Sequence, residues 1–381
     1  MHVCFFSHYS KTHKNGASLS LINIAKEMAN RGIKVTIIIP NKDFRFPINH
    51  KNIKMINIPM FSKRTKINDY SIQNNVKEIV KIAYNTIVVR KVSKILKDNK
   101  PDIIHINGLD SSVGARVAKS LNVPYIWHIR QLLEEDFGIR LHNNNKIYQM
   151  LEDADSVIAV SRTVKEKFEK KLGKEIEIIY NGIPLDEYVI NNKKPLFSQE
   201  TINILLAGRI VEQKGQLEAI KAIKYLVDNA IWNVKLTIIG SMQDNVYVKE
   251  IKEYIKRFGL NDYIQISDHV NDLREIRKAH DIGLICSRKE AFGRVTIETM
   301  ASGMLVIGAN TGGTLEIIKD HKNGYLYNQG DPESLAEKIK YIINNKKEAI
   351  SVKNNGYRTA LEKYSISQNV DRIIHLYKRI L

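Results

Sequence analysis

The sequence has little cysteine and no long apolar run. Its 381 residues include two cysteines, Cys4 and Cys286, each within a short apolar stretch that is typical of a β-strand. Such residues suit buried free thiols better than a disulfide or a metal site, and no cluster of metal ligands accompanies them. No stretch approaches the roughly 18 apolar residues that span a bilayer, and the first residues lack the pattern of a signal peptide. We therefore expect a cytoplasmic protein.

The sequence also lacks internal repeats and low-complexity tracts, which excludes solenoid and disordered architectures. Its apolar fraction of 43% and charged fraction of 26% are those of an ordinary soluble globular protein. At about 150 residues per domain, the length predicts two domains.

Acidic residues are scarce in the first quarter of the chain. Residues 1–100 hold 19 Lys and Arg against 5 Asp and Glu, whereas residues 101–381 hold 40 against 36. Nucleic acid is an unfavoured partner because no nucleic-acid-binding motif accompanies the charge. Two interpretations stay open, a solvated basic surface and attraction to an anionic membrane surface, where each basic residue contributes about 1 kcal/mol.

Residues 77–100 predict a long basic amphipathic helix that would favour the membrane interpretation. Seven basic residues lie in this segment. Its apolar residues, with one that precedes it, are Val76, Ile79, Val80, Ala83, Ile87, Val88, Val92, Ile95 and Leu96. On this interpretation the protein would be peripheral on the inner face of the plasma membrane.

Short apolar, β-branched runs alternate with helical patterns along the chain. The first series lies at 3–6, 35–39, 53–58, 103–106, 125–128, 156–160 and 176–179. The second series lies at 202–207, 234–239, 264–267, 282–286, 305–308 and 324–327. Buried parallel strands read as continuous apolar runs joined by helices. The fold class is therefore α/β, with two doubly wound, Rossmann-like domains.

A polar, turn-rich stretch at residues 181–200 is interpreted as the linker between these domains. We place the first domain at residues 1–190 and the second at 191–365. The last helix, within residues 366–381, would be spare in the second sheet and is expected to cross back to the first domain.

Loops that follow three strands of the second domain carry candidate site residues, because open α/β sheets bind ligands beyond the carboxyl ends of their strands. Arg209 and Lys214 follow the strand at 202–207. Arg can grip phosphate oxygens through its planar fork, and Lys acts as a compact charge. Glu290 follows the strand at 282–286, and Glu298 lies in the next helix, so both could accept hydrogen bonds from sugar hydroxyls.

Glycines complete the pattern. Gly312 and Gly313 open a helix after the strand at 305–308, and glycine allows a ligand to approach the backbone closely. Free amides at two helix starts can bind phosphate. Singly, each feature has an ordinary structural explanation, such as a turn or a surface charge. Their joint placement on successive strand ends suits a nucleotide diphosphate sugar.

These residues resemble the signature of a known family. The segment from Glu290 to Glu298 is similar to the E-x7-E motif of the retaining glycosyltransferases of family 4, the group 1 glycosyl transferases, whose fold is GT-B. Met300-Ala301-Ser302-Gly303 and Gly312-Gly313 follow as in that family, and Gly208-Arg209 with Lys214-Gly215 resembles its diphosphate-binding segment. The resemblance extends over nearly the whole chain and implies two domains that face each other across a cleft.

The resemblance implies a role for each matching residue. In the second, donor-binding domain, Arg209 and Lys214 would neutralise the diphosphate, and Glu290 would orient sugar hydroxyls. Glu298 would hold the ribose of the nucleotide. The backbone amides of Phe292 and Gly293, with Gly312 and Gly313, would complete the donor site.

The first domain would lie on the acceptor side. Asn15-Gly16-Ala17-Ser18 is similar to the family's glycine-rich loop, so Gly16 would approach the diphosphate and the acceptor. His128, at the end of a strand, matches the family's histidine near the reacting sugar. Many relatives have an acidic residue just after this histidine, whereas here Ile129 and Arg130 follow. What orients His128 is thus open, and Arg130 becomes a candidate contact for an anionic donor or acceptor.

Three further positions keep a structural interpretation beside the functional one. Ser161 and the pair Asn181-Gly182 match family positions near the cleft, but they read equally well as a helix cap and a plain turn. His105 also ends a strand, and we interpret it as structural.

The implied function is retaining, metal-independent transfer of a hexose from a nucleotide-diphosphate sugar to a glycan or lipid-linked acceptor in bacterial surface polysaccharide synthesis. No cofactor is expected, and no divalent metal would be required. His128, Glu290, Arg209 and Lys214 are the expected catalytic residues. The alternatives are an epimerase or phosphorylase of the same fold, or a non-catalytic nucleotide-sugar binding protein.

Overall fold

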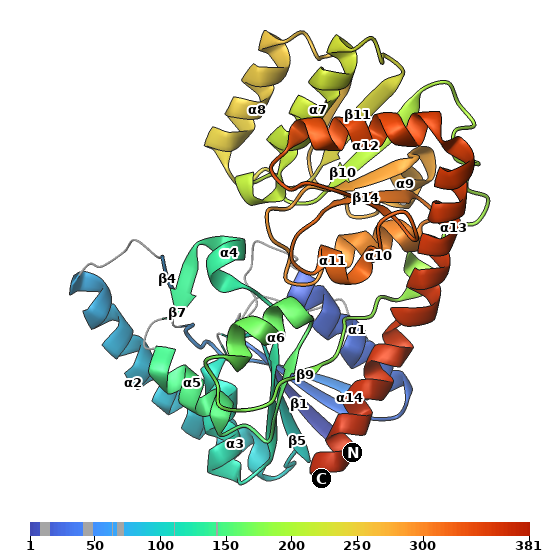
Figure 1. Cartoon of the computed structure of the whole chain (residues 1–381). Helices are drawn as coiled ribbons and strands as arrows, with labels where there is room; N and C mark the ends of the chain where they lie inside the picture. The colour runs from blue at the N-terminus through green and yellow to red at the C-terminus, as the bar shows by residue number, and fades with distance from the viewer. Residues whose placement is uncertain (8–15, 41–48, 63, 67–71, 110, 142–143) are drawn as a thin grey trace. The chain divides into compact units, whose positions relative to one another are not determined.

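The computed structural model describes residues 1–7, 16–40, 49–62, 64–66, 72–109, 111–141 and 144–381. For residues 64–66, 72–79, 136–137, 140–141 and 144 it describes the backbone alone. The chain divides into two compact units (Figure 1), the first comprising Met1–Gly182 with Ile366–Leu381 and the second Ile183–Ser365. Each unit is an α/β domain built on a parallel sheet, as the alternating apolar runs predicted.

The first unit has a seven-stranded parallel sheet of order β3-β2-β1-β5-β6-β8-β9. These strands are β1 (His2–Ser7), β2 (Lys34–Ile39), β3 (Ile53–Asn57), β5 (Ile103–Asn107), β6 (Tyr125–Ile129), β8 (Ser156–Ala159) and β9 (Glu177–Ile178). Its helices are α1 (Gly16–Asn30), α2 (Ile72–Lys97), α3 (Ser112–Leu121), α4 (Leu133–Phe137), α5 (Asn144–Glu152), α6 (Arg162–Glu169) and α14 (Ile366–Ile380). A small antiparallel pair, β4 (Arg64–Lys66) and β7 (Ile139–Leu141), was not predicted.

The second unit has a six-stranded parallel sheet of order β12-β11-β10-β13-β14-β15. These strands are β10 (Ile202–Ala207), β11 (Val234–Ile239), β12 (Ile264–Ser267), β13 (Ile282–Ile285), β14 (Leu305–Ala309) and β15 (Tyr325–Tyr327). Its α-helices are α7 (Gln216–Asp228), α8 (Asn245–Arg257), α9 (Arg274–Ala279), α10 (Arg294–Ala301), α11 (Thr314–Ile317), α12 (Pro332–Asn344) and α13 (Lys346–Lys363). Two 3-10 turns, η1 (Leu185–Glu187) and η2 (Glu212–Lys214), complete it.

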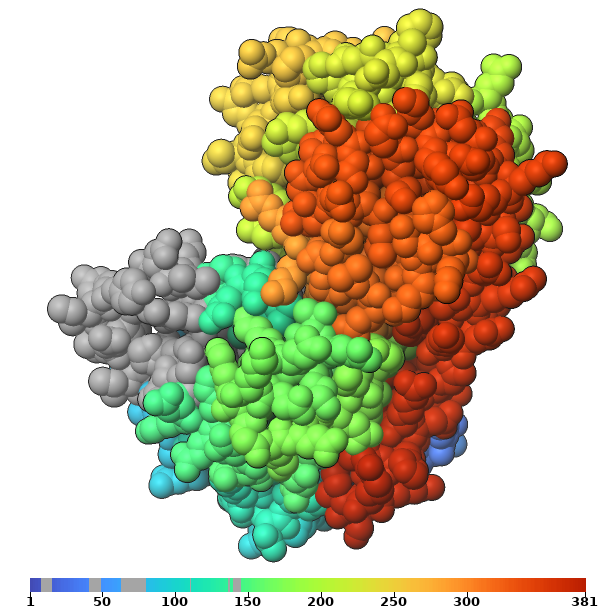
Figure 2. All heavy atoms as spheres, in the orientation of Figure 1, coloured from blue at the N-terminus to red at the C-terminus, as the bar shows by residue number. Residues whose placement is uncertain are grey.

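The last helix, α14, belongs to the core of the first unit. Val370, Ile373 and Tyr377 are fully buried there in one cluster with apolar residues of β1, β2 and α1. Arg31, which directly follows α1, forms an ion pair with Asp371 of α14. In Figure 2 the C-terminal residues, coloured red, are seen at the surface of this unit. The C-terminal helix therefore belongs to the same domain as the N-terminal part of the chain.

Residues 183–200 pack on the second unit rather than forming a free linker. The Ile183 amide donates to the Tyr364 carbonyl at 2.9 Å, and the Ile183 side chain is fully buried. Lys193 donates to the backbone carbonyls of Arg277 and His280, and burial lowers its pKa to about 8. The division therefore lies between Gly182 and Ile183, and not between residues 190 and 191 as the turn-rich sequence suggested.

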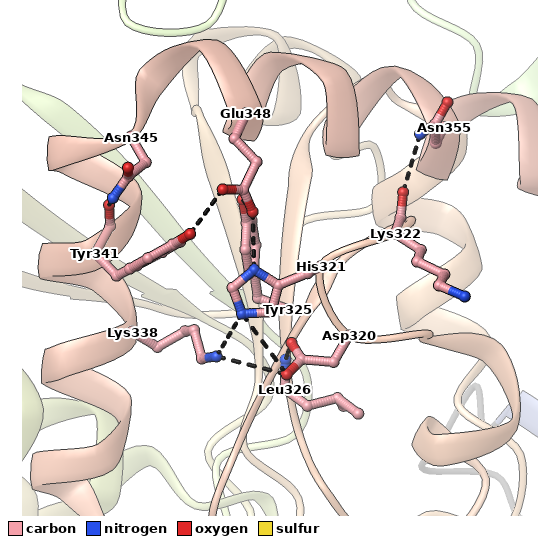
Figure 3. A network of polar contacts seen from close by, with 10 residues as sticks. All are labelled: Asp320, His321, Lys322, Tyr325, Leu326, Lys338, Tyr341, Asn345, Glu348 and Asn355. Carbon is pink, nitrogen blue, oxygen red and sulfur yellow. Dashed lines mark hydrogen bonds and ion pairs between the residues drawn. The ribbon is translucent and has the colours of Figure 1, made fainter.

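A polar network fastens α12 and α13 to β15 (Figure 3). The Glu348 carboxylate accepts a hydrogen bond from Tyr341 at 2.7 Å, lies 2.8 Å from His321 Nδ1, and accepts from Tyr325 at 3.2 Å. These contacts hold the pKa of Glu348 below its usual value, the Tyr341 bond most of all. The arrangement gives His321 a structural role.

Candidate functional site

The strand order of the second sheet reverses between β10 and β13, and ligands of doubly wound sheets bind at such a point. The loops after β10, β13 and β14 are joined to one another here. The Arg288 amide donates to the Gln213 carbonyl at 3.0 Å, and Thr311 Oγ1 donates to the Arg288 carbonyl at 3.1 Å. The three loops that the sequence marked thus form one platform.

Lys214 and Glu290 form an ion pair on this platform. Lys214 Nζ lies 2.5 Å from Glu290 Oε1, and Ser287 Oγ donates to the same oxygen at 2.6 Å. Burial raises the pKa of Glu290, but Lys214, Ser287 and Arg209 together bring it below its usual value. Glu290 is therefore ionised at neutral pH. The sequence named both partners of this pair but not Ser287.

The ion pair stays accessible to a ligand. The Lys214 side chain is 23% exposed and that of Glu290 is 17% exposed. Gly215, at φ +70°, ends the 3-10 turn η2 that carries Lys214, and an added Cβ there would lie 2.1 Å from the Cys286 carbonyl oxygen. The loop after β10 can therefore approach the end of β13 this closely only because residue 215 is glycine.

Gly312 and Gly313 serve contact between loops. A Cβ on Gly312 would lie 2.5 Å from the Glu290 carbonyl oxygen, and one on Gly313 would lie 2.5 Å from that of Phe292. The Gly313 amide also donates to the Glu290 carbonyl at 2.8 Å. We expected these glycines to admit a ligand, whereas the close approach that the structure describes is to protein backbone. Their contact with a donor stays a prediction.

Phe292 and Gly293 lead into α10. The Phe292 side chain is buried, and its ring lies 6.1 Å from that of Tyr364 in an edge-on arrangement. Gly293 has φ +97° and precedes the first helical residue, and in the described structure no side chain caps this end of α10. The contact of these two backbone amides with a donor stays a prediction.

Glu298 lies buried between two arginines. Its Oε1 accepts from Arg294 Nε at 2.7 Å, and its Oε2 accepts from Arg277 Nη2 at 2.7 Å. Burial raises the pKa of Glu298, but the two guanidinium groups bring it below its usual value. The Tyr188 hydroxyl accepts from Arg294 at 3.2 Å. Each carboxylate oxygen has a second lone pair, so the predicted ribose contact would be added to these bonds.

The reversal in the first sheet lies between β1 and β5. Gly16 is the first residue of α1, which follows β1, and a Cβ there would meet nothing within 4 Å. Asn15 of the predicted glycine-rich loop lies outside the described residues, whereas Ala17 and Ser18 follow Gly16 in α1. The approach of Gly16 to a diphosphate or an acceptor stays a prediction.

His128 lies fully buried on β6, in contact with a second histidine. Its Nδ1 is 3.1 Å from His105 Nε2, and His105 Nδ1 is 2.5 Å from the Tyr377 hydroxyl. Burial and the nearby Arg130 charge lower the pKa of both histidines well below the usual value. The side chain in contact with His128 is thus His105, which in turn contacts Tyr377. His105 was read as merely structural, and no local pattern marked Tyr377.

Arg130 is 5% exposed and joins distant parts of the first unit. Its Nε donates to Asn107 Oδ1, and its Nη1 donates to Asn181 Oδ1 at 2.5 Å. Its contact with an anionic substrate stays a prediction. Asn181 does more than form a turn, since it holds Arg130. The Ser161 hydroxyl accepts from the Val164 amide at 3.1 Å, which confirms the helix-cap interpretation.

Three further observations concern the described part of the chain. Both cysteines are buried free thiols, as predicted. Over the described residues there is no group of three or more His, Cys, Asp or Glu side chains that could hold a metal ion. Of the helices the structure describes, none has the length and apolar character to cross a membrane.

Comparisons with known proteins agree with this geometry. The model of Glycosyltransferase Family 4 matches residues 14–187, and that of Glycosyl transferases group 1 matches residues 190–359. The capsular polysaccharide biosynthesis glycosyltransferase CapM of Staphylococcus aureus is 28% identical over 60% of this chain and 62% of its own length. An Escherichia coli UDP-Gal:alpha-D-GlcNAc-diphosphoundecaprenol alpha-1,3-galactosyltransferase is 24% identical over 74% of this chain and 77% of its own.

A solved structure shares the fold of the whole chain. The Anabaena protein HepE in complex with UDP-glucose superposes with a TM-score of 0.77, at 20% identity, over 100% of both chains. The two family models account for the two units. The first E-x7-E residue, Glu290, lies in the loop after β13, and the second, Glu298, lies in α10. The chain therefore belongs to the group 1 glycosyltransferases, with the GT-B fold.

Proposed function

We propose that this chain transfers a sugar from a nucleotide-diphosphate sugar, with retention, to a glycan or lipid-linked acceptor in bacterial surface polysaccharide synthesis. The Lys214–Glu290 pair, where the strand order of the second sheet reverses, is the observation that carries the proposal. Relatives named for capsular polysaccharide synthesis and for galactose transfer to a diphosphoundecaprenol acceptor support the acceptor class. The complex of HepE with UDP-glucose supports the donor class.

The pair suits exchange between a resting and a donor-bound state. Without donor, Lys214 and Glu290 neutralise each other. A diphosphate would compete for Lys214 because its charge is larger, and Glu290 would then be free to accept hydrogen bonds from sugar hydroxyls. Binding would thus place the cation on the leaving group and the carboxylate on the sugar.

The same charges would favour the chemical step. The bond between the anomeric carbon and the phosphate oxygen breaks, the acceptor hydroxyl oxygen bonds to that carbon, and its proton passes to a phosphate oxygen of the leaving group. Negative charge grows on the diphosphate, so Lys214 and Arg209 stabilise the transition state more than the ground state. These cations take the place of a divalent metal in the proposal.

Substitution of the pair tests the donor site. Lys214→Met and Glu290→Gln should each lower kcat/KM about 100-fold or more, in the range seen when charge-stabilising groups are removed. Lys256→Met, which removes an exposed lysine from the end of α8, should stay within about twofold. Near-normal turnover in both site variants would refute the assignment.

Product analysis separates the alternatives. NMR of the product should show the donor's anomeric configuration, and turnover should persist in EDTA. Inversion would contradict the proposed mechanism. Donor conversion without acceptor would indicate an epimerase, and a requirement for free phosphate would indicate a phosphorylase. Binding without any turnover would favour the non-catalytic protein.

We further propose that α2 docks the protein on an anionic membrane. Its residues Val88, Val92 and Leu96 are buried, whereas Val80 is 63% and Ile87 is 62% exposed. The predicted single apolar face is thus divided between the core and the surface, and the side chains of Val76 and Ile79 lie outside the described residues.

The exposed face of α2 combines apolar and basic groups. Val80, Tyr84 and Ile87 follow one another at helical spacing, and the Phe61 ring lies 5.2 Å from that of Tyr84. The exposed basic residues of the next turns are Arg90, Lys91, Lys94 and Lys97. Apolar side chains beside clustered cations complement the acyl boundary and head groups of anionic lipid. Such a surface would bring the enzyme to a lipid-linked acceptor.

Vesicle flotation tests this surface. Wild-type protein should float with vesicles of phosphatidylglycerol and phosphatidylcholine but not with phosphatidylcholine alone, and added salt should weaken the binding. Val80→Ser with Ile87→Ser should lower the partition about tenfold or more, because buried methyl groups contribute about 0.8 kcal/mol each. Val246→Ser, at an 81% exposed valine of the second unit, is the matched control. Equal flotation of all variants would refute the docking proposal.

A further inference from the structure

Three buried side chains form a single file of hydrogen bonds in the first unit. The Tyr377 hydroxyl, on α14, is 2.5 Å from His105 Nδ1, and His105 Nε2 is 3.1 Å from His128 Nδ1. All three side chains have no solvent exposure. The chain joins the last helix of the protein to the histidine at the end of β6.

The direction of the protons along this file follows from its first member. Burial raises the pKa of Tyr377 well above its usual value, so the hydroxyl keeps its proton. Among the described residues, the hydroxyl has His105 Nδ1 as its one hydrogen-bond partner. Were it to accept from that nitrogen, its own proton would be left buried without an acceptor, which is costly. The hydroxyl therefore donates to Nδ1.

The two imidazoles then take a defined tautomer. Burial lowers the pKa of both histidines well below the usual value, so both are neutral, with one donor and one acceptor nitrogen each. His105 accepts at Nδ1 and must donate from Nε2 to His128 Nδ1. His128 consequently carries its proton on Nε2.

That nitrogen faces no acceptor among the residues that the structure describes. In the described part of the chain, His128 Nε2 is out of contact with solvent and has no hydrogen-bond partner. Buried donors are almost always satisfied, and the exceptions call for an explanation such as a ligand that completes them.

We propose that Tyr377 and His105 are positioning residues that hold His128 in its Nε2–H tautomer, as a hydrogen-bond donor to a substrate oxygen. On this account His128 is not a general base, because its acceptor nitrogen is occupied by His105. The inference rests on the proposed function, since the oxygen would belong to the sugar or diphosphate of the donor.

The packing of α14 explains how a hydroxyl so late in the sequence is placed precisely. Asn369 Nδ2 donates to the Tyr180 carbonyl at 2.5 Å, and Arg31 pairs with Asp371. The Phe5 ring lies 4.7 Å from the His105 ring and restricts its rotation. Elements of one unit therefore hold the Tyr377 end of the file and its middle member, His105.

NMR of the full chain with 15N-labelled histidine tests the tautomer directly. Long-range proton–nitrogen spectra distinguish a protonated ring nitrogen from a bare one, and a His128→Gln variant assigns the signals. His128 should show a protonated Nε2 and a bare Nδ1. Tyr377→Phe should convert this pattern to a mixture of tautomers. Tyr125→Phe, which removes another buried hydroxyl of the same unit bonded to the Met150 carbonyl, should leave it unchanged.

A protonated Nδ1 on His128 in the wild-type protein would overturn the inference. So would a His128 spectrum that is the same in wild type, Tyr377→Phe and His105→Gln. Tyr377→Phe should also lower kcat about tenfold with little change in KM, while Tyr125→Phe stays within twofold. Unchanged kcat in Tyr377→Phe would refute the positioning role. A wild-type protein without turnover would count against the proposed function, and the spectrum would still decide the tautomer.

Discussion

Gly312 lies where two loops of the candidate site touch, and its replacement by alanine tests how that site is held together. The residue has φ +53°, in the left-handed region. Its added Cβ would lie 2.5 Å from the Glu290 carbonyl oxygen and 2.9 Å from the Glu290 amide nitrogen. Both atoms belong to backbone, which cannot rotate away as a side chain can.

Two costs follow from this geometry. Alanine in a left-handed conformation costs about 1–2 kcal/mol. Ordinary contacts begin at 3.4 Å, so the loops must separate by almost 1 Å. Overpacking of this kind costs typically about 1–3 kcal/mol. Gly312→Ala should therefore destabilise the second unit by about 2–5 kcal/mol.

Gly330→Ala is the matched control. Gly330 lies in the same unit with φ +82°, and a Cβ there would meet nothing within 4 Å. Gly330→Ala should lower the stability of the second unit by the backbone cost alone, about 1–2 kcal/mol. Native-state hydrogen exchange of β13 and β14 amides reads the stability of this unit separately from that of the first.

Activity should follow the displacement of Glu290. A misplacement of about 1 Å can cost about 100-fold in rate, so Gly312→Ala should lower kcat/KM by about 10- to 100-fold. Gly330→Ala should keep near-normal activity. Equal stability losses in the two variants, or full activity in Gly312→Ala, would refute the view that this glycine serves contact between loops.

Other outcomes follow from the same contacts. Arg277→Gln leaves Glu298 with one guanidinium partner and should destabilise the second unit by about 2 kcal/mol. Hydrogen exchange measures this change, and an unchanged stability would refute the role of Arg277. The pKa values of Glu290 and Glu298 lie below those of the unfolded chain, so their stabilisation is present above about pH 4.3 and is lost as the pH falls through the folded values. Thermal melting between pH 3 and 7 should show this loss of stability at low pH, and the loss should be smaller in Arg277→Gln. Ser161→Ala should cost about 1 kcal/mol, measured by faster exchange at the start of α6, and unchanged exchange would contradict the capping role.

The sequence was sufficient for both sheets because buried parallel strands leave continuous apolar runs. β4 and β7 could not be predicted, because each has three residues. The residues of β4 are Arg64, Thr65 and Lys66, which form no apolar pattern. The stretch at 181–200 reads as a linker because it is polar. Its anchors are Ile183 and Lys193, whose backbone partners no sequence pattern reveals.

Candidate site residues could be predicted where their spacing in the sequence matched a motif or placed them directly after a strand. Glu290 and Glu298 are fixed by one motif, and Lys214 by its place after a strand. The residues that support them were not visible, because Arg277 and Tyr377 come from other parts of the chain. The pairing of Arg294 with Glu298 could have been predicted, because the two residues are four positions apart on one helix face.

The measurement that tests the central claim most directly is calorimetric titration of UDP, GDP and ADP into wild type, Lys214→Met and Lys256→Met, all in EDTA. We predict that one nucleotide binds the wild type and Lys256→Met equally and binds Lys214→Met at least tenfold more weakly. Equal affinity in all three proteins, or no binding of any nucleotide, would contradict a donor site built on the Lys214–Glu290 pair.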